Sequence, residues 1–274
     1  VTDGTRTDVA TGLPAVLTPQ SFLLVFVSRK AAAGEPVAAN TDEADACQRT
    51  FVLPTRIVWQ SQKEASSDSA RYDVTGTGHL LGPKRGQIPE TSDYAAKIQG
   101  CSLVNRGNAP GIILDFGKEL HGGLQLGVSA RSSRGMKLRI RFGESVAETL
   151  SDAASGIRGA GNDHAMRDLE LAVPTMGTAE IGNSGFRFVR IDLLTFGTVE
   201  FESVRAIELT RPMPRLGAFR SSDDRLNRIF ETAVRTVHLC CQNYIWDGIK
   251  RDRLVWMGDT HPETMTVLNV FGAA

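Results

Sequence analysis

From about residue 97 onward, short segments of alternating or continuous apolar residues follow one another and predict β-strands. Lys137–Phe142 alternates polar and apolar positions without a break, so one face should be wet and the other buried. Turn residues such as Ser132–Gly135 separate neighbouring segments. Short strands with turns every ~8–12 residues, and no helical segments between them, indicate an antiparallel sandwich rather than a parallel α/β sheet. The other predicted strands are 112–116, 124–128, 168–173, 186–193 and 199–209.

The hydrophobic period changes after Arg211–Pro214, which indicates a linker. Between Leu226 and Tyr244 the apolar residues recur at helical spacing, and this pattern predicts an amphipathic helix. Ser221 or Ser222 is expected to cap its start. A second helix is expected to begin at the capping-box spacing of Thr260–Glu263.

The patterns divide the chain into three parts and predict a mainly β, jelly-roll-like fold followed by helices. Residues 1–95 form an N-terminal region of strands and loops, in which Phe22–Val27 and Arg56–Trp59 are the candidate strands. Residues 96–211 form the β-sandwich domain, and residues 212–274 begin a helical domain.

Composition narrows the class of function. The 274 residues carry 31 Lys and Arg against 31 Asp and Glu, so the formal net charge is zero. A neutral chain argues against a dedicated nucleic-acid binder or a polybasic membrane binder. The longest apolar run, 22–27, is too short to span a bilayer. A soluble protein is expected, and its compartment stays open between the cytoplasm and a periplasmic or secreted location.

The chain contains four cysteines, none at the Cys-x-x-Cys spacing of zinc or redox sites. Cys240 and Cys241 lie on the predicted helix and are expected to be buried as small apolar residues. Because metal-ligand spacing is also missing elsewhere, we expect no metal and no cofactor.

The segment from Asp247 to Asp259 joins the two predicted helices and is the richest in chemistry. It holds three carboxylates, three cations and Trp256, and Trp246 comes just before it. Carboxylates and arginines hydrogen-bond sugar hydroxyls, and aromatic faces pack on sugar rings. Glycosidic cleavage also needs a protonated carboxyl group and a second carboxylate, and neighbouring carboxylates can raise a pKa into the useful range. The segment therefore indicates a carbohydrate site.

Each of these residues has a structural alternative. Asp247 could end a helix and Asp259 could cap one. Residues 251–253 could be a solvated ion-pair cluster, and Trp256 could belong to a core. Glu144, which ends a predicted strand, is expected to be solvated or to pair with an arginine.

The order Asp-x3-Arg-Asp/Glu-Arg-x2-Trp-x-Gly-Asp at 247–259, behind a β-sandwich, resembles the signature of glycoside hydrolase family 78, the α-L-rhamnosidases. Three upstream stretches resemble the same family in the same order, namely Asp115–Leu124, Leu138–Glu144 and Gly185–Val189. Phe51–Gln60 is a weaker match to an earlier strand.

By that resemblance Asp252 takes the general-acid position, with Asp247 as the alternative. Because the family inverts configuration, a separate carboxylate would activate water about 6.5–9.5 Å away. The sequence departs from the family in two places: the acid is often Glu there, and Gly248–Ile249 replaces a frequent Cys-Pro. The residues expected to hold the sugar are Asp247, Arg251, Trp256, Asp259 and Trp246.

The family's catalytic domain is an (α/α)6 toroid, and the residues after Arg220 have room only for its first helices. The resemblance thus implies an N-terminal part of a longer rhamnosidase, without the general base and inactive alone. Its expected partners are a rhamnose-containing oligosaccharide or glycoside, and either the missing C-terminal catalytic segment or a second copy of the chain. The alternatives are a non-catalytic carbohydrate-binding module, or a different glycosidase or phosphorylase built from a sandwich and a helical toroid.

Overall fold

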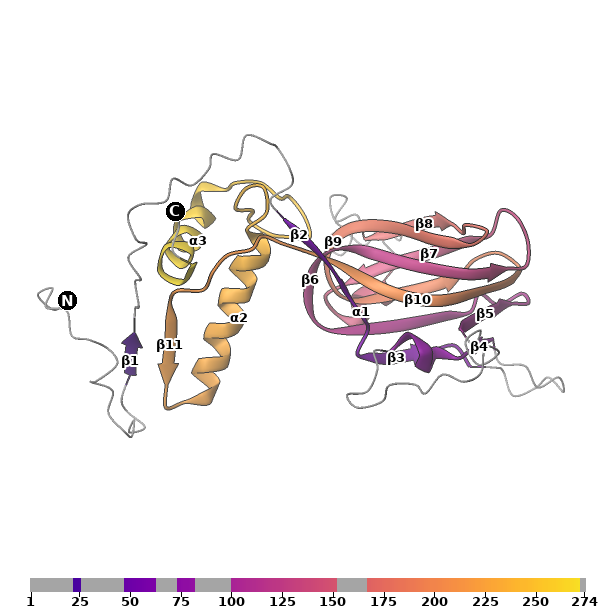
Figure 1. The fold of residues 1–274 in the computed structure, drawn as a ribbon, viewed down its shortest axis with the longest axis horizontal. Coiled ribbons are helices and arrows are strands. Elements are labelled where there is room, and N and C mark those ends of the chain that lie inside the picture. The colour runs from indigo at the N-terminus through magenta and orange to yellow at the C-terminus, as the bar shows by residue number, and fades with distance from the viewer. Residues whose placement is uncertain (1–21, 26–46, 63–72, 82–99, 152–166, 272–274) are drawn as a thin grey trace, which may run out of the picture. The chain divides into compact units, whose positions relative to one another are not determined.

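The computed structural model describes residues 22–25, 47–62, 73–81, 100–151 and 167–271 (Figure 1). The chain divides into two compact units, which are described separately. The sandwich unit comprises residues 49–209 and 248–253, and the helical unit comprises 1–48, 210–247 and 254–274. The sandwich unit therefore begins well before residue 96, because strands near residues 50–75 join its sheet.

In the sandwich, the pairings among β3 to β10 are antiparallel, as the alternating pattern predicts. The order along the main path of the sheet is β4-β5-β10-β6-β9-β7-β8, with β2 beside β10 and β3 beside β6. A 3-10 helix, η1 (Thr77–Leu80), and a short helix, α1 (Val146–Leu150), lie between strands. The strands are β2 (Gln48–Val52), β3 (Arg56–Gln60), β4 (Val74–Thr75), β5 (Cys101–Asn105), β6 (Gly111–Arg131), β7 (Lys137–Gly143), β8 (Asp168–Ala172), β9 (Gly177–Leu193) and β10 (Gly197–Thr210).

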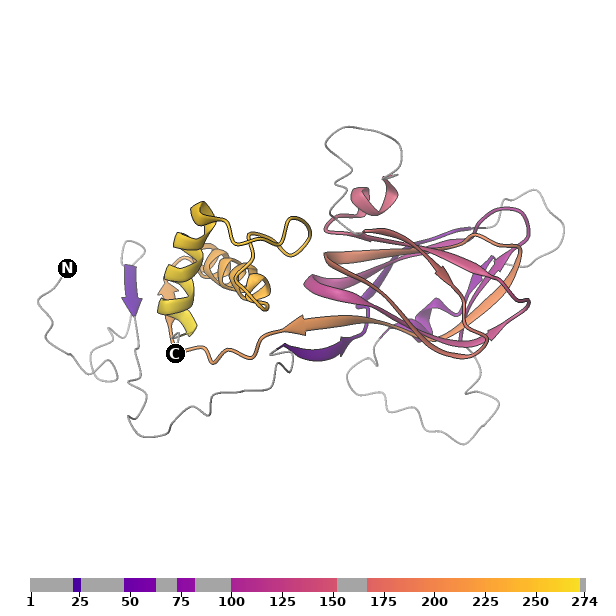
Figure 2. The same cartoon turned by 90° about the horizontal axis from the view of Figure 1, so that it is seen from above.

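Strand β6 explains how one sheet encloses a core. Its residues 112–115 pair with β3, its residues 122–131 pair with β10, and β9 runs along its other side. The change of partner falls where the β6–β9 register shifts, between Asp115 and Leu120. The sequence indicated two strands separated at Gly117, whereas the structure has one long strand with a bulge there. Figure 2 shows β6, β9 and β10 curving around a common interior.

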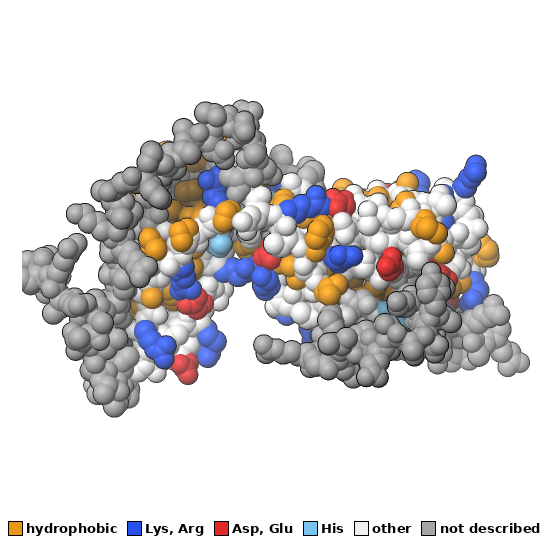
Figure 3. All heavy atoms as spheres, viewed as in Figure 1, with side chains coloured by type: hydrophobic (Ala, Val, Ile, Leu, Met, Phe, Trp, Pro, Cys, Tyr) orange, Lys and Arg blue, Asp and Glu red, His pale blue; other side chains and the backbone are white. Residues whose placement is uncertain are grey.

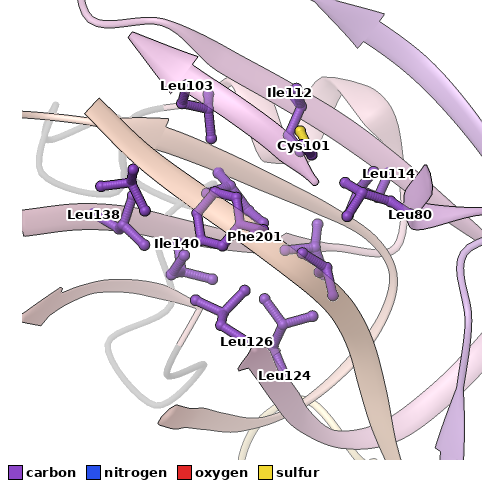
Figure 4. Close-up of a cluster of buried hydrophobic side chains, with 14 of the residues drawn as sticks. Leu80, Cys101, Leu103, Ile112, Leu114, Leu124, Leu126, Leu138, Ile140 and Phe201 are labelled. Carbon is purple, nitrogen blue, oxygen red and sulfur yellow. The ribbon is translucent and has the colours of Figure 1, made fainter. Parts of the chain in front are cut away.

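The core lies inside this curved sheet. The inward positions of the alternating segment, Leu138 and Ile140, are fully buried. They lie around Phe201 of β10 (Figure 4). Burying each Leu, Ile or Phe side chain contributes about 1.5–3 kcal/mol. On the face displayed in Figure 3, the hydrophobic side chains of the sandwich are scattered among polar ones, which is ordinary for an exposed surface.

The helical unit contains the two predicted helices. They are α2 (Asp224–Cys240) and α3 (Met257–Thr266), and α3 continues into a π-helical turn, η4 (Val267–Phe271). Val234 of α2 packs with Val270 and Phe271 in a small buried cluster. Strand β11 (Ala218–Ser221) pairs antiparallel with β1 (Phe22–Val25), which falls in the predicted strand at 22–27.

The start of α2 differs from the prediction. Its N-cap is Asp223, whose side chain accepts a hydrogen bond from the Arg225 amide at 2.7 Å, so the expected cap at Ser221 or Ser222 is wrong. The hydroxyl of Ser221 instead accepts from the Asp223 amide at 3.1 Å. Several capping residues in a row compete for one role, and the sequence does not settle that competition.

The end of α2 and the start of α3 also move. Helix α2 stops at Cys240, so Tyr244 lies in the turn that follows. Helix α3 begins at Met257, three residues before Thr260. The Thr260 hydroxyl donates to the Trp256 carbonyl at 2.7 Å, so the expected capping box is wrong. Among the described residues, no helix has the length and apolar character needed to cross a membrane.

Candidate functional site

The segment that the sequence singled out contains a loop closed at its base. The Asp247 amide donates to the Leu254 carbonyl at 3.0 Å, and the Leu254 amide donates to Oδ1 of Asp247 at 2.8 Å. Residues 248–253 lie between these two positions, and we call them the 248–253 loop. Helix α2 ended earlier, at Cys240, so the structure does not use Asp247 as a helix end.

The 248–253 loop packs within the sandwich unit. Ile249 is 8% exposed. It lies against Gly185 of β9, so close that a Cβ added at Gly185 would fall 2.6 Å from Cγ1 of Ile249. Lys250 Nζ lies 2.7 Å from Glu148 of α1 and 3.0 Å from Glu144, just after β7. Burial by itself would lower the pKa of Lys250, but its hydrogen bonds with Glu148 and Glu144 raise it. Glu144 was expected to be solvated or to pair with an arginine, and its partner is this lysine.

Arg253 forms the other anchor of the loop. Its Nη1 donates to Oδ1 of Asn183 at 3.4 Å, its Nη2 donates to the Asn183 carbonyl, and its Nε donates to the Ile249 carbonyl at 3.1 Å. Burial lowers the pKa of this guanidinium. Arg253 thus links the end of the loop to β9 and to the loop's own beginning.

Asp252 lies between these anchors in an unusual backbone conformation. Its φ is 58° and that of Arg253 is 57°, and both are left-handed. Asp tolerates this region, whereas a long side chain such as Arg costs roughly 1–2 kcal/mol there. The Asp252 side chain is 29% exposed, and its Oδ2 accepts a hydrogen bond from Arg251 at 3.0 Å. Strained backbone of this kind persists where the surroundings enforce it.

A second group of carboxylates lies in the helical unit. Burial raises the pKa of Glu263, and the negative charges of Asp259 and Asp247 raise it further. Asp259 lies in the first turn of α3 and is not its N-cap, so the cap alternative does not hold. From the sequence, Glu263 was interpreted only as part of a capping box, and its proximity to the carboxylates of Asp259 and Asp247 was not predicted. The signal was its spacing of four from Asp259, which places both residues on one face of a helix.

The two tryptophans differ in exposure. Trp256 is 51% exposed, so the alternative that it belongs to a core is wrong. Its neighbours Leu254, Val255 and Met257 are also exposed, and together they form an apolar stretch. Trp246 is half-buried, and its amide donates to the Cys240 carbonyl at 3.0 Å.

The predicted site residues divide between the two units. Arg251 and Asp252 belong to the sandwich unit. The other residues belong to the helical unit, and they are Trp246, Asp247, Trp256 and Asp259.

The upstream stretch Asp115-Phe116-Gly117 has a structural role. Burial by itself would raise the pKa of Asp115, but hydrogen bonds from Arg187, the Gly117 amide and Arg56 lower it to about 2. Arg187 makes two of these bonds, at 2.8 and 3.0 Å. The Gly117 amide bonds at 2.7 Å, and its φ of 83° requires a residue that tolerates left-handed backbone.

The three upstream stretches meet through their phenylalanines. Phe186 of β9 packs edge-on against Phe116 of β6, with ring centroids 5.9 Å apart, and against Phe142 of β7, at 4.8 Å. Each stretch also carries a residue used next to this cluster: Asp115 binds Arg187, Glu144 binds Lys250, and Gly185 receives Ile249. Two of the three stretches, through Glu144 and Gly185, thus contact the loop, and the phenylalanine cluster joins all three.

Among the residues that the structure describes, no group of His, Cys, Asp or Glu is arranged to hold a metal ion. Cys240 and Cys241 are buried and free, as predicted. Burial raises the pKa of Cys240 to about 12 and that of Cys241 to about 11.

One segment of the chain matches a known protein family. Residues 214–274 match the family model of the bacterial α-L-rhamnosidase 6 hairpin glycosidase domain. That range contains α2, the 248–253 loop and α3. The resemblance of this chain to the bacterial α-L-rhamnosidases is therefore confirmed.

Solved structures extend the likeness to the fold. A rhamnosidase from Klebsiella oxytoca with rhamnose bound matches with a TM-score of 0.59 and 22% identity, over 83% of this chain and 42% of that one. A GH78 family rhamnosidase of Bacillus sp. GL1 matches with a TM-score of 0.53 and 20% identity, over 64% of this chain and 18% of that one. The chain thus spans less than half the length of either protein. It has no significant match to a curated protein sequence.

Proposed function

We propose that this chain is part of a glycoside hydrolase that removes terminal α-L-rhamnosyl residues with inversion, and that Asp252 is its general acid. One observation supports the proposal above the others. Asp252 lies in a left-handed turn, between Lys250 and Arg253, which anchor the loop to the sandwich, and within the range that matches the rhamnosidase family. A fixed backbone on both sides is what a general acid needs to reach a leaving-group oxygen reproducibly.

Asp252 is a better candidate for the acid than Asp247. Oδ1 of Asp247 accepts a hydrogen bond from the Leu254 amide and so holds the base of the loop. A carboxylate oxygen bonded to a backbone amide of its own loop is less free to reach a leaving-group oxygen. Asp252 accepts only a side-chain bond from Arg251 among the bonds described for it, and a side chain can move aside.

The helical unit would supply sugar recognition. Asp247, Asp259 and Glu263 offer carboxylate oxygens that accept hydrogen bonds from rhamnose hydroxyls. The exposed face of Trp256, with Trp246 nearby in sequence, offers a surface for the apolar side of the ring. Because rhamnose is neutral, no excess of either charge is required of the chain as a whole.

The second carboxylate of an inverting reaction would stand about 6.5–9.5 Å from the acid, with water between them. We propose that residues outside these 274 supply it, either in a C-terminal catalytic segment or in a second copy of the chain. By itself the chain would then bind rhamnosides without turning them over. Robust hydrolysis of an aryl rhamnoside by the 274-residue chain alone would contradict this part of the proposal.

The test compares Asp252→Asn with Asp247→Asn in the natural protein that contains these residues, using aryl α-L-rhamnosides with poor and good leaving groups. Loss of a general acid should lower kcat by about 10²–10⁴ on the poor leaving group and much less on the good one. Asp247→Asn should lower kcat/KM by the same factor for both substrates, because binding of the rhamnosyl group does not depend on the leaving group. Equal losses on both substrates in Asp252→Asn would contradict its role as acid.

The stereochemistry is checked on the same protein by following the first-formed anomer with proton NMR. Inversion predicts that β-L-rhamnose appears before mutarotation. Initial release of the α anomer would contradict inversion while leaving the substrate class intact.

A further inference from the structure

We infer that the β-sandwich positions the acid, with Gly185, Ile249 and Arg253 acting as positioning residues for Asp252. This inference rests on the proposed role of Asp252 and adds a task for the sandwich within that site. The family model that matches the chain covers 214–274 and not the strands of the sandwich, so the match itself assigns them no such task.

The contacts of the 248–253 loop carry the inference. Before the left-handed pair, Ile249 is buried against β9 and Lys250 is held by Glu144 and Glu148. After the turn begins, Arg253 bonds to Asn183. The acid thus has a sandwich anchor on both sides of it in sequence, while its own carboxylate, among the contacts described for it, bonds to Arg251 within the loop.

The backbone of the turn explains why anchors are needed. The left-handed conformation costs roughly 1–2 kcal/mol at Arg253 and less at Asp252, because Asp tolerates this region. Without compensation the turn would relax and carry the Asp252 carboxylate with it. Three hydrogen bonds from Arg253, two to Asn183 and one to the Ile249 carbonyl, hold the strained conformation. Because Asp is one methylene shorter than Glu, small backbone shifts here change what the carboxylate can reach.

Gly185 gives a way to move the loop without changing it. A methyl group at this position would lie 2.6 Å from Cγ1 and 2.9 Å from Cδ1 of Ile249, and 3.3 Å from the Lys250 amide nitrogen. Gly185→Ala therefore forces Ile249 to shift, and we expect this shift to carry the loop away from β9, because Ile249 is buried and the Lys250 amide also lies close. Gly78→Ala is the matched control, because nothing lies within 4 Å of a Cβ there.

The experiment measures the ratio of kcat on good and poor leaving groups in the natural protein. We expect Gly185→Ala to lower kcat on the poor leaving group by about 10-fold or more, because misplacing a catalytic group by about 1 Å can cost up to 100-fold. The kcat on the substrate with the good leaving group, and the KM of both substrates, should change little. Gly78→Ala should match the wild type. Adding Ile249→Ala to Gly185→Ala removes the clashing atoms and should restore part of the ratio.

A second measurement needs no turnover and works on the 274-residue chain. Trypsin cuts after Lys250, Arg251 and Arg253 only when the loop separates from the sandwich, so Gly185→Ala should speed cleavage at these bonds. Mass spectrometry of the fragments over time measures the cleavage rate. A thermal melt checks that the variant is folded.

The outcomes separate this inference from the proposed function. Suppose that Asp252→Asn loses much more kcat on the poor leaving group than on the good one, whereas folded Gly185→Ala keeps the wild-type ratio and the wild-type cleavage rate. The positioning role is then wrong, and the assignment of Asp252 as the acid stands. If Asp252→Asn lacks the signature, the acid assignment is wrong, and positioning of an acid falls with it even where the cleavage rate rises.

Discussion

Asp115→Asn should be among the most damaging conservative changes in the sandwich unit. The side chain of Asp115 is 3% exposed, and its two oxygens accept bonds from Arg56, Arg187 and the Gly117 amide. An asparagine would turn an N–H group toward one of these donors and lose the charge. Removing one partner of a buried ion pair costs about 3–5 kcal/mol. Arg187 and Arg56 are 40% and 62% exposed and stay hydrated, so we expect a loss of about 2–3 kcal/mol.

The pKa of Asp115 gives an independent magnitude. A shift from 3.8 to about 2 corresponds to roughly 2 kcal/mol, at about 1.4 kcal/mol per unit. Because the folded-state pKa is the lower one, this stabilisation is fully present above the unfolded pKa of 3.8. It is lost as the pH falls through the folded value of about 2. The variant cannot ionise there and should lack this part of the acid dependence.

Urea unfolding followed by tryptophan fluorescence measures both effects. Trp59 lies in β3, the strand that pairs with Asp115, and replacing Trp246 and Trp256 by Phe leaves Trp59 as the only reporter of the three. Glu170→Gln is the control, since its pair with Lys137 has both side chains 56% exposed and should be worth under about 0.5 kcal/mol. The reasoning fails if Asp115→Asn lies within about 0.5 kcal/mol of wild type at neutral pH. It also fails if both proteins lose the same stability between about pH 5 and pH 2.

Two further predictions concern the helical unit. The raised pKa values of Cys240 and Cys241 should slow their reaction with a thiol reagent. For Cys241 the shift from 9.0 to about 11 leaves about 100-fold less thiolate at mildly alkaline pH than in the urea-unfolded chain, and comparable rates in both states would contradict it. Asp223→Ala should destabilise α2 by about 1 kcal/mol through loss of the cap bond to Arg225, and Asp224→Ala by less. Thermal melts followed by circular dichroism measure the stability of both variants. Equal losses of stability in Asp223→Ala and Asp224→Ala would contradict the assignment of Asp223 as the cap.

The sequence was informative where structure follows from local pattern. Alternation in Lys137–Phe142 correctly predicts that Leu138 and Ile140 face the core, because successive residues of any strand point to opposite faces. The wet opposite face is wrong at Arg141, which is 6% exposed and pairs with Asp192. The continuity of β6 through Gly117 could not be predicted, since it depends on which strands pair on either side of the bulge. The caps failed for a related reason, as several residues able to cap stand next to one another.

The candidate site shows a similar division. The carboxylates and tryptophans of 247–259 stand out because their chemistry is visible residue by residue. The residues of the sandwich that contact the loop cannot be recognised in the sequence. Lys250 and Glu144, for example, are separated by 106 positions, and an ion pair between distant residues leaves no local pattern. Glu263 stayed hidden since the same spacing also suits a capping box. The left-handed turn at Asp252 was likewise invisible, because neither Asp252 nor Arg253 is a glycine.

The turn at Asp252 and Arg253 also sets a condition for engineering this protein. Glycine at position 253 would relieve roughly 1–2 kcal/mol of backbone strain. It would also remove the three hydrogen bonds that Arg253 makes. Because the relieved strain and the lost hydrogen bonds change stability in opposite directions, a melting temperature alone does not report whether the loop has been released, so selection at these two positions has to include turnover.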